Sequence, residues 1–290
     1  GPETIMHQTL SLPSVGKPAI QPAEISSGFG PFALELLCRL TGGQFLIYED
    51  NATHRIPENL MQEYHPDYMS TAEFQESAKR SRIKLAILQA ANMSHEKPPQ
   101  RNDLKFRADS LGTLRVALTE AQKQCVFAHY PVTPLRTGLE AESKDRMQLA
   151  GKRWQASYDL ALGQVSATEA RLIGLNLRLA QMKVTPLDFQ TPGNNTWLLK
   201  PAPKTSTESP FIARLVTKAE TLLTRVIREH PGTPFAFLAK VELDRGFGWK
   251  WRESRSVWKE ERKKPQPLGL IEPLFRPGRK IIRRHLEVDL

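Results

Sequence analysis

The sequence predicts a mostly α-helical protein: a helical hairpin or bundle, with a small residual α/β edge at the N-terminus and an extended basic tail at the C-terminus. Three observations predict this fold class. Residues 61–185 carry long apolar stripes at helical spacing, residues 211–245 carry a second amphipathic pair, and positive charge is concentrated after residue 245. With 290 residues, the chain is long enough to bury the core of one large domain or two small ones.

Residues 1–60 predict the α/β edge. A helix is expected from Pro31, because proline is tolerated in the first helical turn. Gly42 and Gly43 stop this helix, and the short apolar run at 44–48 then predicts a buried strand. Helix, glycine turn and strand together form the second half of an α/β unit. The apolar stripe of the expected helix comprises Phe32, Leu36, Leu37 and Leu40.

Residues 61–185 predict a helical hairpin with a third helix beside it. Ser70 or Thr71 is expected to cap that third helix, over residues 71–95. Two further stretches alternate steps of three and four residues, a period of about 3.5 that is typical of a coiled-coil seam. Residues 130–138 predict the turn between them. The first seam comprises Leu111, Leu114, Leu118, Ala121, Cys125 and Ala128, and the second Met147, Gly151, Trp154, Tyr158, Ala161, Val165, Thr168, Leu172, Leu175, Leu179 and Met182.

The last third of the chain divides into three parts. Residues 186–210 hold five prolines and predict a linker, or a strap that lies extended across a surface with residues 197–199 as its apolar anchor. Residues 211–245 predict two amphipathic helices separated by a turn at 230–234. Residues 246–290 predict a basic tail.

The net charge of +10 belongs almost entirely to that tail. Residues 245–285 contain 13 Lys and Arg against 4 Asp and Glu, so the rest of the chain is close to neutral. This distribution excludes a uniformly basic domain. The candidate residues for contact with a partner or an anion are Trp249, Lys250, Trp251, Arg252, Trp258, Lys259, Arg262, Lys263, Lys264, Arg279, Lys280, Arg283 and Arg284.

Two interpretations of this tail stay open. Clustered Lys and Arg with tryptophans can hold phosphates and stack on bases, or lie at an anionic membrane surface. Alternatively, the tail docks on the helical body or on a protein partner, which explains its apolar residues Phe275, Ile281, Ile282 and Leu286.

The sequence shows no catalytic motif, and we assign it no catalytic, cofactor-binding or metal-binding residue. Cys38 and Cys125 lie in apolar helical stretches and are expected to be buried free thiols, not a disulfide. No apolar run is long enough to span a bilayer. The cellular compartment and the oligomeric state do not follow from the sequence.

Several weaker patterns favour structural roles over chemistry. Glu63, His65 and Asp67 alternate as metal ligands can, but zinc sites usually combine clustered His or Cys at longer spacing, so a solvated loop is expected. Gly28 and Gly30 lack the third glycine of a dinucleotide fingerprint. Three histidines are expected to interact with the carbonyl ends of helices: His95, His129 and His230.

Two stretches resemble known families. Residues 227–243, with the turn His230-Pro231-Gly232-Thr233-Pro234, resemble a single tetratricopeptide-like unit. Residues 27–45, with the Thr41-Gly42-Gly43 turn, resemble the last helix and strand of a von Willebrand factor A domain from a large bacterial protein. That resemblance implies a metal-dependent adhesion site upstream of Gly1, because the family's Asp-x-Ser-x-Ser motif does not occur in this chain.

From these observations we expect a non-enzymatic interaction or scaffold region of a von Willebrand factor A-like protein. A protein partner is the first expectation. Binding of nucleic acid or anionic lipid through residues 246–290 is the alternative.

Overall fold

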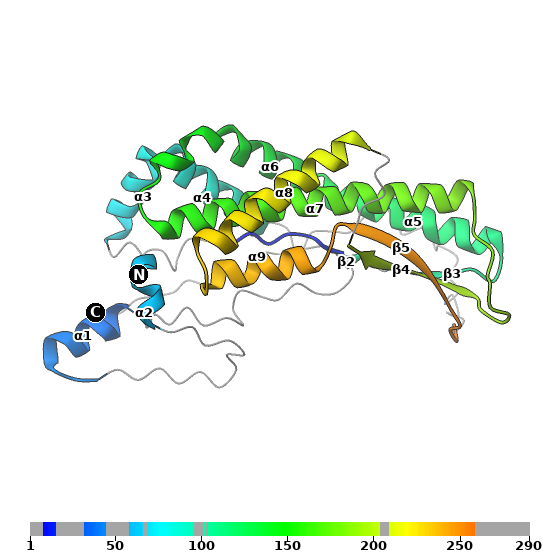
Figure 1. Cartoon of the computed structure of the whole chain (residues 1–290), viewed down its shortest axis with the longest axis horizontal. Helices are drawn as coiled ribbons and strands as arrows, with labels where there is room; N and C mark the ends of the chain where they lie inside the picture. Colours follow the sequence, from blue (N-terminus) through cyan, green and yellow to red (C-terminus); the bar gives the residue numbers. More distant parts are fainter. Residues whose placement is uncertain are drawn as a thin grey trace, which may run out of the picture. The chain divides into compact units, whose positions relative to one another are not determined.

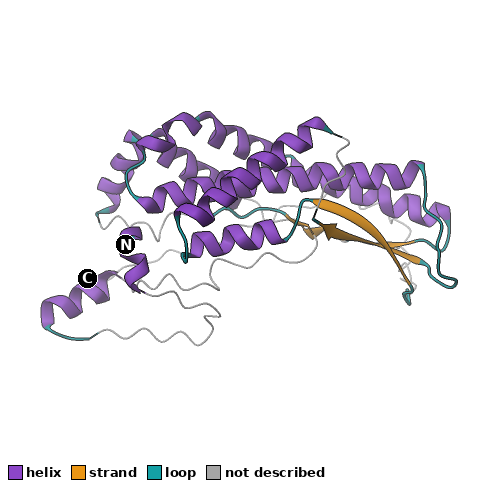
Figure 2. Cartoon of the chain, viewed as in Figure 1, coloured by secondary structure: helices purple, strands orange, loops and turns teal. Residues whose placement is uncertain are grey.

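A computed structural model describes residues 8–15, 32–44, 58–65, 69–95, 101–102, 104–203 and 209–258. These residues are mostly helical and include one three-stranded sheet, so the predicted fold class is confirmed (Figure 2). Residues 1–256 form one compact unit and residues 257–290 a second, of which Val257 and Trp258 are described.

Helix α7 (Lys152–Val184) is the central element of the first unit (Figure 1). The predicted seam from Trp154 to Met182 is buried along its length. Met147, however, lies outside α7 and is 79% exposed. Gly151 is the N-cap residue that immediately precedes α7. Positions between the seam residues are buried too, including Leu162 and Ala170. Because other elements pack against α7 on several sides, α7 is the central helix of a bundle and not one helix of a two-helix coiled-coil seam.

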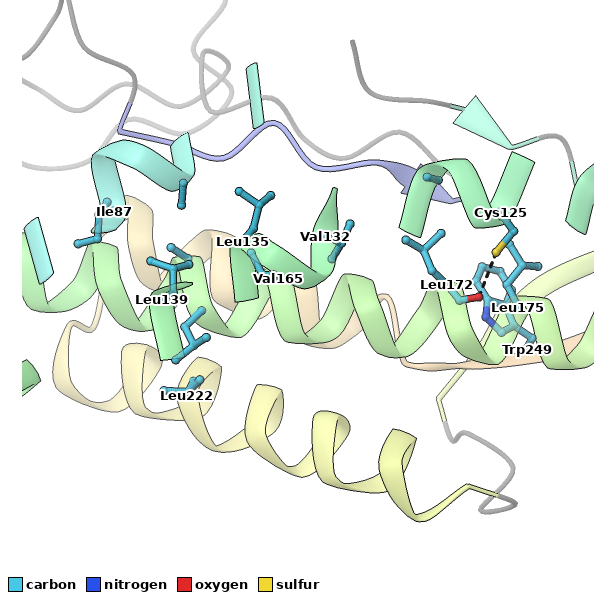
Figure 3. Packing of buried hydrophobic residues seen from close by; sticks show 14 of the residues in the cluster. Ile87, Cys125, Val132, Leu135, Leu139, Val165, Leu172, Leu175, Leu222 and Trp249 are labelled. Carbon is cyan, nitrogen blue, oxygen red and sulfur yellow. Dashed lines mark hydrogen bonds between the residues drawn. The ribbon is translucent and has the colours of Figure 1, made fainter. Parts of the chain in front are cut away.

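Helix α5 (Leu111–His129) packs on α7 through the first predicted seam, all of which is buried except Leu111. The prediction of a turn over residues 130–138 is wrong. Only Tyr130 and Pro131 separate α5 from helix α6 (Val132–Ala141), which α-helical spacing of its apolar residues could have indicated. The apolar stripe of α6 comprises Val132, Leu135 and Leu139 and is buried against α7. Helix α8 covers another side of α7 (Figure 3).

The single helix expected over residues 71–95 is two helices, α3 (Thr71–Arg80) and α4 (Arg82–His95). Ser70 caps α3 in a reciprocal capping box with Glu73, as the sequence predicted for this position. Ser81 makes the break because its backbone is extended and its Oγ accepts a hydrogen bond from the Lys84 N–H at 3.4 Å. The 3-10 helix η4 (Ser143–Gln148) links α6 to α7.

The helix pair predicted over residues 211–245 is present as α8 (Pro210–Glu229) and α9 (Pro234–Asp244). Thr233 caps α9, and Gly232 has a φ of +72°, a conformation that favours glycine in this turn. Helix α8 packs closely on α7 at Gly163, where a Cβ atom would lie 2.8 Å from Leu223 Cδ2.

The sheet consists of β3 (Lys105–Arg107), β4 (Thr196–Ala202) and β5 (Gly248–Ser254), antiparallel in that order. Residues 196–202 of the expected linker or strap form the central strand β4, and its buried Trp197 and Leu199 agree with the strap and its apolar anchor rather than with a linker. The first residues of the expected tail form strand β5, which corrects the start of that tail. The sheet ties these segments to the helices, so residues 61–256 belong to the same compact unit.

Shorter elements complete the described chain. Strands β1 (Ser14–Val15) and β2 (Arg101–Asn102) form a parallel pair. Helix α1 (Phe32–Thr41) matches the predicted helix, and its Leu34, Leu36, Leu37 and Leu40 are exposed. The strand predicted at 44–48 lies almost wholly outside the described residues. Helices α2 (Glu58–Met61) and η3 (Gln62–Tyr64) form a short segment that packs near α9.

Among the residues described, we find no helix that is both long and apolar enough to cross a membrane.

Candidate anion-binding face of the sheet

Strand register divides the side chains of the sheet between two faces. Directly opposed residues in antiparallel strands point to the same side, and successive residues alternate. Phe106, Trp197 and Leu199 are buried and therefore mark the inward face, together with Trp249 of β5. The residues between them in sequence mark the outward face.

The tryptophans of this region belong to the inward face. Trp249 is 4% exposed, and its Nε1 donates a hydrogen bond to the Arg171 carbonyl at 3.0 Å. It lies in the core near Leu172 and Leu175 of α7 (Figure 3). Trp251 is half-buried, with its ring centroid 5.4 Å from that of Phe106. We therefore correct the expectation that Trp249 contacts a partner: it is a core residue, and Trp251 mainly packs on the sheet.

The outward face carries the cations. Lys105, Leu198 and Arg252 lie opposite one another across all three strands. Two residues further along, Lys200 of β4 lies directly opposite Lys250 of β5. All four cationic side chains are exposed, and the half-buried Leu198 lies among them. We call Lys105, Lys200, Lys250 and Arg252 the cationic face.

Three cations of this face are not neutralised from within the described part of the chain. Lys200, Lys250 and Arg252 have no carboxylate within ion-pair distance among the described residues. The nearest acidic residue in sequence, Glu253, is engaged elsewhere, since it accepts hydrogen bonds from the backbone N–H groups of Gln190 and Thr191. Opposed side chains of this register have Cβ atoms about 5 Å apart, so an anion could contact both lysines.

Two of the 13 residues expected to contact a partner lie on this face, namely Lys250 and Arg252. Trp258 is described but belongs to the second unit. The other expected cations lie outside the described residues: Lys259, Arg262, Lys263, Lys264, Arg279, Lys280, Arg283 and Arg284.

Sequence reasoning missed Lys105 and Lys200. Both come from segments far from the basic tail in sequence, and only strand pairing brings them beside Lys250 and Arg252. A local signal was present, because residues 104–107 alternate apolar and basic side chains as a half-buried strand does.

Charges inside the bundle, in contrast, are paired. Asp159 on α7 is fully buried and accepts hydrogen bonds from Arg146 Nη2 and Arg225 Nε, each at 2.8 Å. Arg146 also binds Glu229 at 2.6 Å. This network joins η4, α7 and α8, and it balances two guanidinium groups with two carboxylates.

A second buried carboxylate, Glu169, is held in the same way. Burial alone would raise its pKa, but hydrogen bonds from His129, Thr133 and Arg136 together hold the pKa below its ordinary value. Near the C-terminal end of α9, the Arg171 guanidinium pairs with Glu242 and donates to the Gly246 carbonyl at 2.7 Å. The contacts of Glu169 and the Arg171–Glu242 pair connect neighbouring helices, and each buried charge in them has an opposite charge beside it.

The weaker sequence patterns resolve into structural contacts. Glu63 forms an ion pair with Lys152, and Asp67 lies outside the described residues. No group of three metal-ligating side chains occurs in the part of the chain that the structure describes. Cys38 and Cys125 are both free thiols, as predicted, but only Cys125 is buried.

The three histidines lie at helix ends as expected. His95 contacts the Thr9 carbonyl at 3.0 Å, and His129 lies 3.4 Å from Glu169 Oε1. His230 is the C-cap of α8.

A shallow hollow runs beside α8. It is lined by Ala213, Arg214, Thr217, Lys218, Thr221 and Leu222.

Comparison of the chain with protein-family models, curated proteins and solved structures gave no match. The resemblances to a von Willebrand factor A domain and to a tetratricopeptide-like unit therefore remain predictions.

Proposed function

We propose that this chain is a non-enzymatic interaction module that docks an acidic protein partner on its cationic face. The observation that carries the proposal is the direct opposition of Lys200 and Lys250 on an outward sheet surface. Like charges placed directly opposite each other destabilise a sheet. A ligand that supplies carboxylates between them would relieve this repulsion.

The fold supports such a role because the sheet rests on a well-packed base. Trp197, Leu199 and Trp249 anchor its inward face in the core, so the cations project from a surface that does not need to rearrange on binding. The buried charges of the bundle are already paired, whereas Lys200, Lys250 and Arg252 have no carboxylate within ion-pair distance among the described residues.

An acidic protein fits this face better than a nucleic acid does. Binding of single strands relies on aromatic side chains on which bases stack, whereas the sheet tryptophans point inward. Leu198 provides an apolar contact among the cations, as the centres of protein interfaces do. As part of this proposal, the chain serves as the scaffold region of the von Willebrand factor A-like protein that residues 27–45 resemble.

The second candidate is binding of nucleic acid or anionic lipid through the basic tail, residues 246–290. It is favoured by the eight cations predicted for contact that follow residue 258. Attraction of basic segments to anionic lipid contributes about 1 kcal/mol per Lys or Arg near the surface, so a longer run of cations binds more tightly.

The experiment compares three double variants of the full chain, each with the same change in net charge. Lys200→Glu/Lys250→Glu alters the face, Lys144→Glu/Lys240→Glu alters exposed lysines on helical segments, and Lys263→Glu/Lys264→Glu alters the tail. Binding of labelled polyglutamate, duplex DNA and phosphatidylserine vesicles is measured between low and moderate salt. Circular dichroism checks that each variant is folded.

We expect the full chain to bind polyglutamate, and the face variant to weaken this binding about tenfold while the helix variant leaves it unchanged. Equal effects of the face and helix variants, or no binding of polyglutamate, would overturn the proposal. Tighter binding of DNA or vesicles that depends on Lys263 and Lys264 would replace it with the second candidate.

A further inference from the structure

Residues 58–65 lie against the helix pair as a short strap whose contacts converge on His230. Met61 and Tyr64 are 3% and 5% exposed and pack with Ala156 of α7 and with Phe235 and Leu238 of α9. The strap is therefore held by its own side chains at one end of α7.

The turn between α8 and α9 is shaped to receive this strap. A Cβ atom at Gly232 would lie 2.7 Å from Leu60 Cδ2, so the turn and the strap approach as closely as glycine permits. Tyr64 contacts the same turn, with its ring 5.7 Å from the His230 imidazole in an edge-on arrangement.

One polar contact joins the two elements. Tyr64 Oη lies 2.9 Å from His230 Nδ1, and both residues are buried. The backbone of His230 is fixed independently, because its N–H donates to the Val226 carbonyl and its own carbonyl accepts from Thr233 Oγ1. Movement of the strap therefore does not require movement of the histidine backbone.

The other imidazole nitrogen, His230 Nε2, is buried and has no hydrogen-bond partner among the described residues. A neutral imidazole that carries its proton on Nδ1 donates it to Tyr64 Oη and leaves Nε2 as a bare, unpaired acceptor at a modest cost. An imidazolium carries an N–H on both nitrogens and needs an acceptor or water at each. While residues 58–65 are docked, a proton on Nε2 would be buried without a hydrogen-bond acceptor or water.

Charged groups around His230 come from each element packed against it. Glu229 on α8 and Asp159 on α7 favour the imidazolium, whereas Arg146 in η4 and Lys152 on α7 oppose it. Both carboxylates are already bound by Arg146, and the acidic residue of the strap itself, Glu63, is paired with Lys152. Burial outweighs the remaining attraction and lowers the pKa of His230.

We propose that His230 is a pH-operated latch: the neutral imidazole holds residues 58–65 on the helix pair, and protonation releases them. Release gives Nε2 access to water and exposes the apolar site formed by Ala156, Phe235 and Leu238. This device is separate from the cationic face and does not depend on the function proposed for it.

The direction of the effect follows from linkage. The pKa of His230 is depressed while the strap is docked and returns to about 6.5 when the strap opens. His230 therefore binds a proton more readily in the open form than in the docked form. Docking weakens as the pH falls below about 6.5, because protonation favours the open form. Between pH 7.5 and 5.5 the opening equilibrium should rise by at most about tenfold, a limit that is reached if docked His230 stays neutral throughout.

Hydrogen exchange of the full chain, followed by mass spectrometry at pH 7.5 and 5.5 and corrected for the intrinsic pH dependence of exchange, tests this latch. We expect the peptide covering residues 58–65 to lose protection at pH 5.5, by up to about tenfold, while a peptide from the middle of α7 keeps its protection. In His230→Gln the side chain does not titrate, and strap protection should be equal at both pH values. Equal protection of the wild-type strap at both pH values would overturn the proposal, as would an unchanged pH dependence in His230→Gln.

A second measurement keeps the test decisive if His230→Gln does not fold. NMR titration of the wild-type chain follows the imidazole of His230 and the ring of Tyr64 together. We expect the His230 resonances to shift only as the Tyr64 ring leaves its buried environment. Protonation of His230 with Tyr64 still buried would show that the imidazole is not a latch.

Discussion

Lys200 of β4 lies directly opposite Lys250 of β5 on the outward face of the sheet, and both side chains are exposed. This pairing works against sheet stability, because like charges at directly opposed positions repel. Its presence beside Lys105 and Arg252 gives the sheet a face suited to an anionic partner.

The substitution Lys200→Glu should stabilise the isolated protein. A glutamate would face Lys250 as an opposite charge, and we expect the free energy of unfolding to rise by about 0.5 kcal/mol at low salt. Urea unfolding measures the change, and the gain should shrink in high salt because both charges are exposed. The same gain from Lys144→Glu would show that general charge reduction, not the cross-strand pair, is responsible.

The close contact of α7 with α8 predicts that Gly163→Ala is destabilising. The new methyl group would meet the fully buried Leu223, and overpacking of this kind costs about 1–3 kcal/mol, which exceeds the gain in helix propensity. Gly138→Ala in α6 is the matched control, since no atom lies within 4 Å of its Cβ position. That control should stabilise by about 0.5–1 kcal/mol, and a similar gain at position 163 would contradict the packing.

Asp159 should be among the polar residues most sensitive to substitution. Asp159→Asn keeps the shape of the side chain but leaves Arg146 and Arg225 without their shared carboxylate, and breaking a buried ion pair costs about 3–5 kcal/mol. Glu76→Gln removes an exposed partner of Lys79 and should leave the urea midpoint unchanged. Equal midpoints for the two variants would show that the buried network contributes nothing.

The two thiols should differ in reactivity. Burial raises the pKa of Cys125 to about 12, and its Sγ donates to the Leu172 carbonyl at 3.1 Å, whereas Cys38 is half-buried on α1. A thiol reagent at pH 8 should therefore label Cys38 alone in the native protein and both cysteines in urea. In Cys38→Ser, native labelling should disappear, and rapid labelling of Cys125 would contradict its burial.

The helices could be predicted because their signals are local. The apolar spacing of α7 and the amphipathic pattern of α8 are each visible within one segment, and Ser70 caps the helix that follows it. The turn expected at residues 130–138 failed because Pro131 suggested a longer interruption than the chain makes there.

The sheet could not be predicted in the same way. Residues 248–252 do alternate apolar and basic side chains, but the high charge of the neighbouring tail favours a contact role for Trp249, which strand pairing overturns. Pairing between β3, β4 and β5 joins segments that are about 50 to 90 residues apart, and sequence periodicity carries no information on which strands pair.

The difference between local and long-range signals also explains why the position of His230 could be predicted but its contact with Tyr64 could not. Its position at the end of α8 followed from the helix pattern, whereas its contact with Tyr64 spans 166 residues of sequence. Local patterns place a residue on an element, but tertiary packing decides what its side chain touches.

The most direct test of the cationic face is to find where an acidic ligand lies on the full chain. Carbodiimide links a carboxylate to a lysine in direct contact, and mass spectrometry then identifies the linked lysines. We predict that polyglutamate is linked mainly to Lys200 and Lys250 and much less to Lys144 and Lys240, which are also exposed. Links spread evenly over all four lysines, or confined to residues 259–290, would contradict the assignment of this face as the docking surface.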